Sequence, residues 1–212
     1  MSGYDLYRFM ISIIYPNRCA SCGNIIAHNA YFCLDCKPET AEFEIDDGII
    51  NCCKYDGIAK DLILNAKFHG NGYAVSGAAK LLYDRLLEAN SFSDIDMITY
   101  IPSRKTSIRE RGYCLTKLMA KDIAALSGKP VLRLLNVSDY KISQKELSRE
   151  DRKKNLKGVF SAVKYNFCDK RVLLIDDIST TGSTLNEAEN VLHENGAKKV
   201  IKAVFAKTIL KT

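Results

Sequence analysis

The sequence has no apolar run long enough to span a lipid bilayer. The apolar run nearest its start, Phe9 to Ile14, is far shorter than the roughly 20 residues that a transmembrane helix needs. Asp5 and Arg8 precede this run, and the segment lacks the pattern of an export signal. We therefore expect a cytoplasmic protein with reduced thiols. In that compartment, cysteines placed in pairs are more often metal ligands than disulfides.

The first residues are nevertheless amphipathic. Between Tyr4 and Tyr15, one helical face would carry the apolar residues Leu6, Phe9, Met10, Ile13 and Ile14. We interpret this segment as a short helix packed on the body of the protein, in preference to a helix lying on a membrane. Pro16 is expected to end it.

Tryptophan is absent, and the formal net charge of +6 is moderate for 212 residues. This charge alone does not identify a partner, because its distribution decides what it attracts. The length suits one α/β domain with a small appendage.

One segment, Val172 to Leu185, organises the chain. Its first four residues are apolar and end at Ile175, which predicts a strand buried on both faces, as in a parallel sheet. Asp176 and Asp177 follow at the strand's carboxyl end, where open α/β sheets bind ligands. After a short polar loop, a helix is predicted from the spacing of Leu185, Ala188 and Leu192, with Gly196 just past its end.

The loop between this strand and helix has the composition of an anion site. Its residues are Ser179, Thr180, Thr181, Gly182, Ser183 and Thr184. Backbone N–H groups and hydroxyls there can donate to phosphate oxygens, and glycine permits a tight turn. The two carboxylates would repel a phosphate, so we expect them to accept hydrogen bonds from sugar hydroxyls. The segment has neither a Walker A lysine nor the spaced glycines of a dinucleotide fingerprint.

Two CxxC pairs predict a structural metal site near the start of the chain. The four cysteines are Cys19, Cys22, Cys33 and Cys36. Two facing pairs supply four thiolates in the tetrahedral arrangement that suits Zn²⁺ and leave no open coordination position. Four free cysteines, or a redox pair, are the alternatives.

The other segments predict alternating strands and helices. Strands are expected over residues 49–55, 97–101, 131–135, 158–163 and 199–206, and helices over 58–66, 72–89 and 109 to about 126. Cys52 and Cys53 are adjacent in the first of these strands, so we expect them to point to opposite faces and to be core residues.

Basic residues occur at two further places. Ser103 and Arg104 follow the strand over 97–101, where cations suit a diphosphate. The stretch 141–157 is the most basic of the chain, and includes Lys145, Arg149, Arg152 and Lys153. A solvated surface explains such charge equally well.

The segment from Val172 to Leu185 resembles the phosphoribosyl-diphosphate (PRPP) motif of type I phosphoribosyltransferases. The resemblance implies an α/β fold with a parallel sheet flanked by helices. It also implies that Asp176 and Asp177 hold the ribose 2- and 3-hydroxyls, the loop holds the 5-phosphate, and Mg²⁺ accompanies PRPP. Ser103 and Arg104 would then lie on the diphosphate side, and the basic stretch 141–157 would be a lid over the site.

Over nearly its whole length, the chain resembles the ComF family of competence proteins, a zinc ribbon fused to a phosphoribosyltransferase-like domain. The features that carry this resemblance are Tyr15-Pro16, the CxxC pairs, Tyr55 with Gly57, Leu64–Gly70 with Lys67-Phe68, Arg109–Tyr113, Gln144, Leu147, Arg152, Asn155 and Phe160. The sequence departs from the family pattern at Cys114-Leu115, where an Asn-Gln pair is usual, and after Pro102, where a second proline is usual. Both departures lie near the diphosphate side.

The resemblance implies an N-terminal helix and zinc ribbon over 1–45 and a phosphoribosyltransferase-like domain over 46–212. It also implies a role in natural transformation and DNA uptake, with single-stranded DNA and an ATP-driven DNA translocase as partners. Arg109, Arg111 and the basic stretch are candidates for DNA contact, and Tyr113, Tyr140 and Tyr165 for base stacking.

Two other functions stay open. In an active phosphoribosyltransferase, Asp176 and Asp177 would be catalytic and would stabilise the positive charge that develops at the ribosyl centre. We find no segment that resembles an acceptor site. A zinc-braced scaffold with an inert pocket is the third reading.

Overall fold

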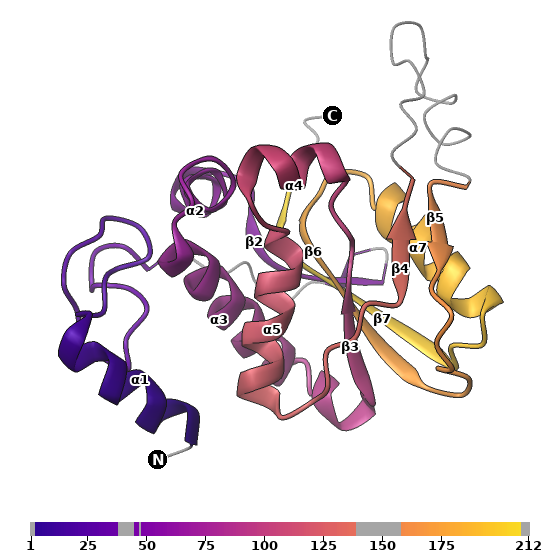
Figure 1. The fold of residues 1–212 in the computed structure, drawn as a ribbon, viewed down its shortest axis with the longest axis horizontal. Helices are drawn as coiled ribbons and strands as arrows, with labels where there is room; N and C mark the ends of the chain where they lie inside the picture. The colour runs from indigo at the N-terminus through magenta and orange to yellow at the C-terminus, as the bar shows by residue number, and fades with distance from the viewer. Residues whose placement is uncertain (1–2, 38–44, 47, 139–157, 209–212) are drawn as a thin grey trace, which may run out of the picture.

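The computed structural model describes residues 3–37, 45–46, 48–138 and 158–208 (Figure 1). Five strands form the main sheet in the order β1-β2-β7-β6-β3, with β1 antiparallel to β2 and the other pairs parallel. In chain order the elements are α1 (Gly3–Ile14), β1 (Ile45–Asp46), β2 (Ile49–Lys54), α2 (Gly57–Phe68), α3 (Gly72–Glu88), a 3₁₀ turn (Ser91–Asp94), β3 (Met97–Tyr100), α4 (Lys105–Arg111), α5 (Leu115–Ser127), β4 (Leu135–Val137), β5 (Phe160–Ala162), β6 (Arg171–Ser179), α7 (Ser183–Glu194) and β7 (Lys199–Lys207).

The sheet is covered on both faces, which confirms the predicted fold class. Leu173 and Ile175 of β6 pack into a core with α2, α3 and α5, while Val172 and Leu174 pack into a second core with α7, β4 and β5. All four side chains are fully buried. Figure 1 shows α3 and α5 on one side of the sheet and α7 on the other. Burial on both faces explains why this strand is uniformly apolar.

The predicted helix after the loop is confirmed as α7. Its buried residues are Leu185, Ala188 and Leu192, and Gly196 follows the C-cap residue Asn195 with φ of +96°. β4 and β5 form a separate antiparallel pair beside α7.

Three local expectations are wrong. The helix predicted from residue 109 is two helices, because Gly112 adopts a φ of +83° and ends α4 before α5 begins. The predicted strand over 131–135 is a single bridge from Val131 to Ile98, and β4 begins only at Leu135. Cys52 and Cys53 are core residues as expected, but their Sγ atoms lie 3.6 Å apart because the side chains turn toward each other.

The N-terminal segment packs closely on α3. A Cβ atom at Gly77 of α3 would lie 2.6 Å from Cβ of Ala20 and 2.9 Å from Cζ of Phe32. Ala20 is fully buried in the same core as α3, and Phe32 packs against that core. Glycine at this position therefore allows the backbone of α3 to approach the cysteine-rich segment.

Helix α1 forms as predicted, but its expected packing on the body is wrong. Met10, Ile13 and Ile14 are 62%, 72% and 76% exposed. The ring of Phe9 meets the ring of His28 edge to face, with centroids 5.1 Å apart. No helix among the described residues is long and apolar enough to cross a membrane.

Ion pairs occupy the amino ends of the parallel strands. The Arg171 guanidinium lies 2.8 Å from Asp96, and the Lys199 ammonium lies 3.0 Å from Asp94. These cations lower the pKa values of both carboxyls. The charges of Arg171 and Lys199 are therefore compensated at this edge of the sheet.

Candidate functional site

The acid pair belongs to β6 itself and lies near the strand's carboxyl end. Asp176 pairs in register with Val204 of β7, and β6 continues to Ser179. Asp176 is buried, whereas Asp177 is partly exposed. Each carboxylate accepts a hydrogen bond from the following backbone N–H: Asp176 Oδ1 from Asp177 at 2.8 Å, and Asp177 Oδ1 from Ile178 at 2.7 Å.

The two carboxyls have different electrostatic surroundings. Burial, reinforced by the negative charge of Asp177, raises the pKa of Asp176 well above its usual value. Asp177 instead forms an ion pair, with its Oδ2 atom 2.7 Å from Nζ of Lys67 in α2. Lys67 thus compensates the charge of Asp177, whereas burial disfavours the charged form of Asp176. Carboxyl oxygens accept hydrogen bonds from hydroxyls, as recognition of a diol requires.

The hydroxyl loop connects β6 to the N-terminus of α7. Gly182 adopts a φ of +72°, and its N–H donates to Ser179 Oγ at 3.1 Å. Thr181 and Ser183 hydroxyls lie 2.7 Å apart, and Thr180 and Thr181 are exposed. The loop thus places hydroxyls and the amino end of a helix beside the acid pair, an arrangement that suits an anion.

In the segment after β3, the hydroxyl of Ser103 forms a hydrogen bond within the protein. Ser103 Oγ donates to Cys114 Sγ at 3.3 Å. Cys114 also contacts Thr116 Oγ1 at 3.2 Å, and that hydroxyl donates to Ile101 O at 2.6 Å. Cys114 stands at one of the two positions where the sequence departs from the ComF pattern. Its thiol therefore binds the hydroxyl of Ser103, a residue predicted to face the diphosphate. Arg104 is the residue before α4.

A pocket of about 380 Å³ lies where the end of α2 meets α4. Its lining residues are Lys67, Phe68, Gly70, Ser107, Glu110 and Arg111. Tyr113 donates its hydroxyl to the carbonyl oxygen of Ala66, which ties the end of α2 to the segment after α4. Lys67 therefore belongs both to this pocket and to the ion pair with Asp177.

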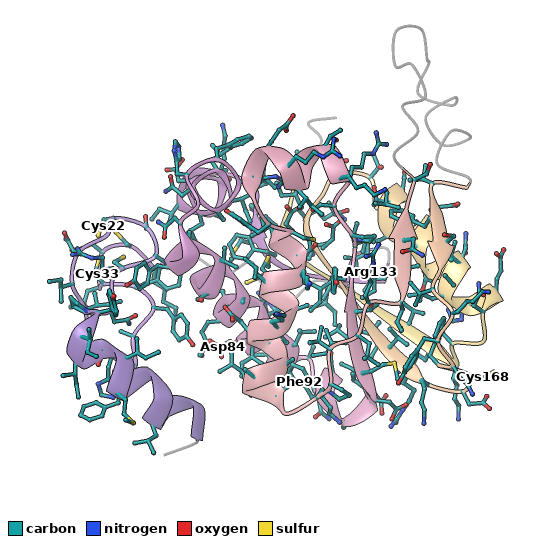
Figure 2. The ribbon with its side chains drawn as sticks, in the orientation of Figure 1. Cys22, Cys33, Asp84, Phe92, Arg133 and Cys168 are labelled. Carbon is teal, nitrogen blue, oxygen red and sulfur yellow. The ribbon has the colours of Figure 1, made fainter. Side chains whose placement is uncertain are left out.

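The four cysteines of the two CxxC pairs come together, as predicted. One Sγ atom from each of Cys19, Cys22, Cys33 and Cys36 lies within 4.8 Å of the others. Cys22 and Cys33, which Figure 2 shows side by side, have sulfurs 3.8 Å apart. A tetrahedral site with Zn–S bonds of about 2.3 Å has sulfurs about 3.8 Å apart, so the donor set fits Zn²⁺.

The thiol pKa values also fit a cation site. Burial raises the pKa of Cys19, but backbone N–H groups of Cys22 and Cys33 outweigh it and lower that pKa to about 6. The neighbouring Cys33 thiol and burial raise the pKa of Cys36 to about 12. Four thiolates so close together need a cation to be ionised at once.

Known families and proteins resemble this chain in sequence and in fold. Residues 119–211, which include the acid pair and its loop, match the family model of the phosphoribosyl transferase domain. Competence protein F of Haemophilus influenzae is 28% identical over 188 residues, which cover 86% of this chain and 81% of that protein. The chain is a homologue of competence protein F. The resemblance to the ComF family is thereby confirmed.

One further relative and one solved structure are also similar to this chain. The DNA utilization protein YhgH of Salmonella typhimurium is 25% identical over 190 residues, which cover 86% of this chain and 80% of that protein. The fold is similar to that of adenine phosphoribosyl transferase from Trypanosoma brucei, with a TM-score of 0.50, 14% identity, and coverage of 80% of this chain and 86% of that one.

In this competence protein F homologue, the described residues predicted to face the sugar phosphate lie at or after the carboxyl ends of β3 and β6. Asp176, Asp177 and the loop are contiguous, and Arg111 lines the nearby pocket, whereas Arg109 is exposed on α4. The basic stretch with Lys145, Arg149, Arg152 and Lys153 lies outside the described residues, as does Tyr140. Tyr113 is only partly exposed, and its hydroxyl donates a hydrogen bond to the carbonyl oxygen of Ala66.

Sequence reasoning missed two residues of this edge. Lys67 and Phe68 were noted only among the features that carry the family resemblance. Their spacing in the sequence did not predict a contact with Asp177. The contact between Lys67 and Asp177 joins residues far apart in the chain, so it requires the fold to be known.

Proposed function

We propose that the protein handles single-stranded DNA during natural transformation and binds PRPP, or a ribose 5-phosphate group, at the carboxyl end of β6. The observation that carries the proposal is the acid pair placed directly before the hydroxyl loop and the N-terminus of α7. Asp176 and Asp177 would hold the ribose diol, and residues 179–184 the 5-phosphate. The names of the relatives, competence protein F and DNA utilization protein, support the DNA-uptake part.

The remaining groups follow from this assignment. Ser103 and Arg104 would lie beside the diphosphate, and Mg²⁺ would neutralise part of its charge. Zn²⁺ would be held by the four cysteines and would brace the N-terminal segment, since four protein ligands leave no open position. We place the protein in the cytoplasm, with an ATP-driven DNA translocase as partner and with Arg109, Arg111 and the stretch 141–157 as candidate DNA contacts.

An active phosphoribosyltransferase is the second candidate, favoured by the match to the phosphoribosyl transferase domain. In that reaction the ribosyl carbon passes from diphosphate to an acceptor, and Asp176 and Asp177 would stabilise the positive charge of the transition state. Against it, the sequence contains no segment that resembles an acceptor site.

Calorimetric titration of the zinc-loaded protein with PRPP and Mg²⁺ tests the sugar-phosphate site. The variant is Asp177→Asn, which keeps the side-chain shape but removes its charge. The matched control is Asp169→Asn, at an exposed position before β6 with φ of +58°, which asparagine tolerates. We expect PRPP affinity to fall at least tenfold in the first variant and not in the control. Absence of PRPP binding to the wild type would overturn the proposal.

A parallel titration with a single-stranded oligonucleotide, with and without PRPP, tests DNA handling. If PRPP changes the DNA affinity, DNA must change the PRPP affinity by the same factor. Release of diphosphate on addition of candidate acceptors would instead favour the transferase.

A further inference from the structure

The pocket between α2 and α4 combines cations with an exposed aromatic ring. Lys67 and Arg111 lie in its lining, and Phe68 is 71% exposed beside them. A large apolar side chain at that exposure gains little from folding, because most of its surface remains in water. Its position in the lining of a charged pocket of about 380 Å³ therefore suggests a ligand with an aromatic part and a negatively charged part.

We propose that this pocket binds one nucleotide of a single strand, with its base stacked on Phe68 and its phosphate held by Lys67 and Arg111. The inference rests on the proposed DNA-handling function and assigns it to residues of α2 and α4 rather than to the zinc ribbon. The volume lies within the range of small-molecule sites and suits a single nucleotide.

The surface around the pocket supports a passing strand rather than an isolated small molecule. Helix α4 carries Lys105, Arg109 and Arg111 against the single acid Glu110, and Arg104 precedes it. Lys105 and Arg109 are exposed. A row of cations beside a stacking ring is the arrangement by which proteins bind single strands without reading their sequence. A duplex fits less well, because its bases are already stacked on one another and offer Phe68 no free face.

Lys67 connects this pocket to the acid pair. Its ammonium lies 2.7 Å from Asp177 and is also part of the pocket lining. A DNA phosphate that attracts Lys67 weakens its hold on Asp177 and leaves that carboxylate available to a ribose hydroxyl. A ribose diol bound to Asp177 likewise leaves Lys67 available to the DNA. The two ligands should therefore strengthen each other's binding, through one side chain that both share.

The experiment measures binding of a fluorescent single-stranded oligothymidylate by anisotropy, with the full zinc-loaded protein, at several salt concentrations and with or without PRPP and Mg²⁺. The variants are Phe68→Ala, Arg111→Ala and Lys67→Met. The matched controls are Tyr165→Ala, which removes a competing stacking candidate from the segment before β6, and Lys198→Ala, which removes an exposed cation just before β7. Thermal melts confirm that each variant is folded.

We expect Phe68→Ala to weaken binding about tenfold, as loss of one stacked base does. Arg111→Ala should reduce the slope of log affinity against log salt by about 0.7, the value for one phosphate contact on a single strand. Lys67→Met should abolish the effect of PRPP on DNA affinity. The controls should bind like wild type. An oligonucleotide carrying 5-bromouracil should also photo-crosslink to the peptide that contains Phe68.

The outcomes separate the two proposals. If wild type binds no single strand, the DNA-handling function is refuted and this inference with it. If wild type binds but Phe68→Ala and Arg111→Ala bind equally well, the function stands and the assigned face is wrong. Crosslinking to the peptide that contains Tyr165 would overturn the assignment in favour of the segment before β6. Equal affinity for duplex and single strand would overturn the stacking argument.

Discussion

Replacement of Gly77 by alanine should loosen the N-terminal segment from α3. Alanine normally stabilises a helix interior by about 1 kcal/mol relative to glycine. At this position its Cβ would lie 2.6 Å from Cβ of Ala20, about 1 Å closer than carbon atoms pack. Phe32 can turn away, but Ala20 can move only with its backbone, next to Cys19 of the cysteine cluster.

Such overpacking costs about 1–3 kcal/mol, which outweighs the gain in helix propensity. We expect Gly77→Ala to lose about 1 kcal/mol of stability and about 2–4 °C in melting temperature. Zinc release to a chromophoric chelator should also be faster. The control is Gly72→Ala in the same helix, where a Cβ meets no described atom within 4 Å. That variant should melt at the same temperature or higher.

The measurement is circular dichroism during heating, with zinc release followed separately by absorbance. A rise in melting temperature for Gly77→Ala equal to that of Gly72→Ala would refute the close packing of Ala20 on α3. Unchanged zinc release in a destabilised Gly77→Ala would show that the strain is absorbed away from the metal site.

Three other outcomes are expected. Asp176→Asn should raise the melting temperature of the ligand-free protein at pH 8 but not at pH 4. Because folding raises the pKa of Asp176, the contribution of this carboxyl to folding stability is complete below about pH 4. That contribution is lost as pH rises through the folded-state pKa. An equal gain at both pH values would contradict this. Cys36→Ser should lower bound zinc below one equivalent in elemental analysis and destabilise residues 19–36 to proteolysis; full zinc content would exclude Cys36 as a ligand. Tyr113→Phe should cost about 1 kcal/mol in denaturant unfolding, because Ala66 loses its hydrogen-bond donor, and an unchanged midpoint would argue against that bond.

The elements with strong local signals were predictable from the sequence. The apolar residues Val172 to Ile175 form the central strand, and the spacing of Leu185, Ala188 and Leu192 gives the buried face of α7. The two CxxC pairs predicted the cysteine cluster because ligand spacing is itself a local property.

The failures arise where tertiary structure overrides local pattern. Gly112 splits a segment that reads as one helix, and the sequence does not reveal that its φ is positive. The exposure of Ile13 and Ile14 contradicts an amphipathic pattern that normally indicates packing. The pairing of Lys67 with Asp177, and of Ser103 with Cys114, depends on which loops the sheet brings to one edge. Local periodicity contains no information about these contacts.

The ion pairs of Asp94 and Asp96 with Lys199 and Arg171 have a consequence for the kinetics of association. They cancel charge at the amino edge of the sheet, while the cations of α4 lie at the opposite edge. A polyanion approaching in solution is therefore drawn toward one end of the molecule and oriented before contact. The association rate should fall steeply with ionic strength. Asp94→Asn removes the partner of Lys199 and leaves that cation uncompensated at the amino edge. The association rate of this variant should be lower, because fewer encounters begin in the correct orientation.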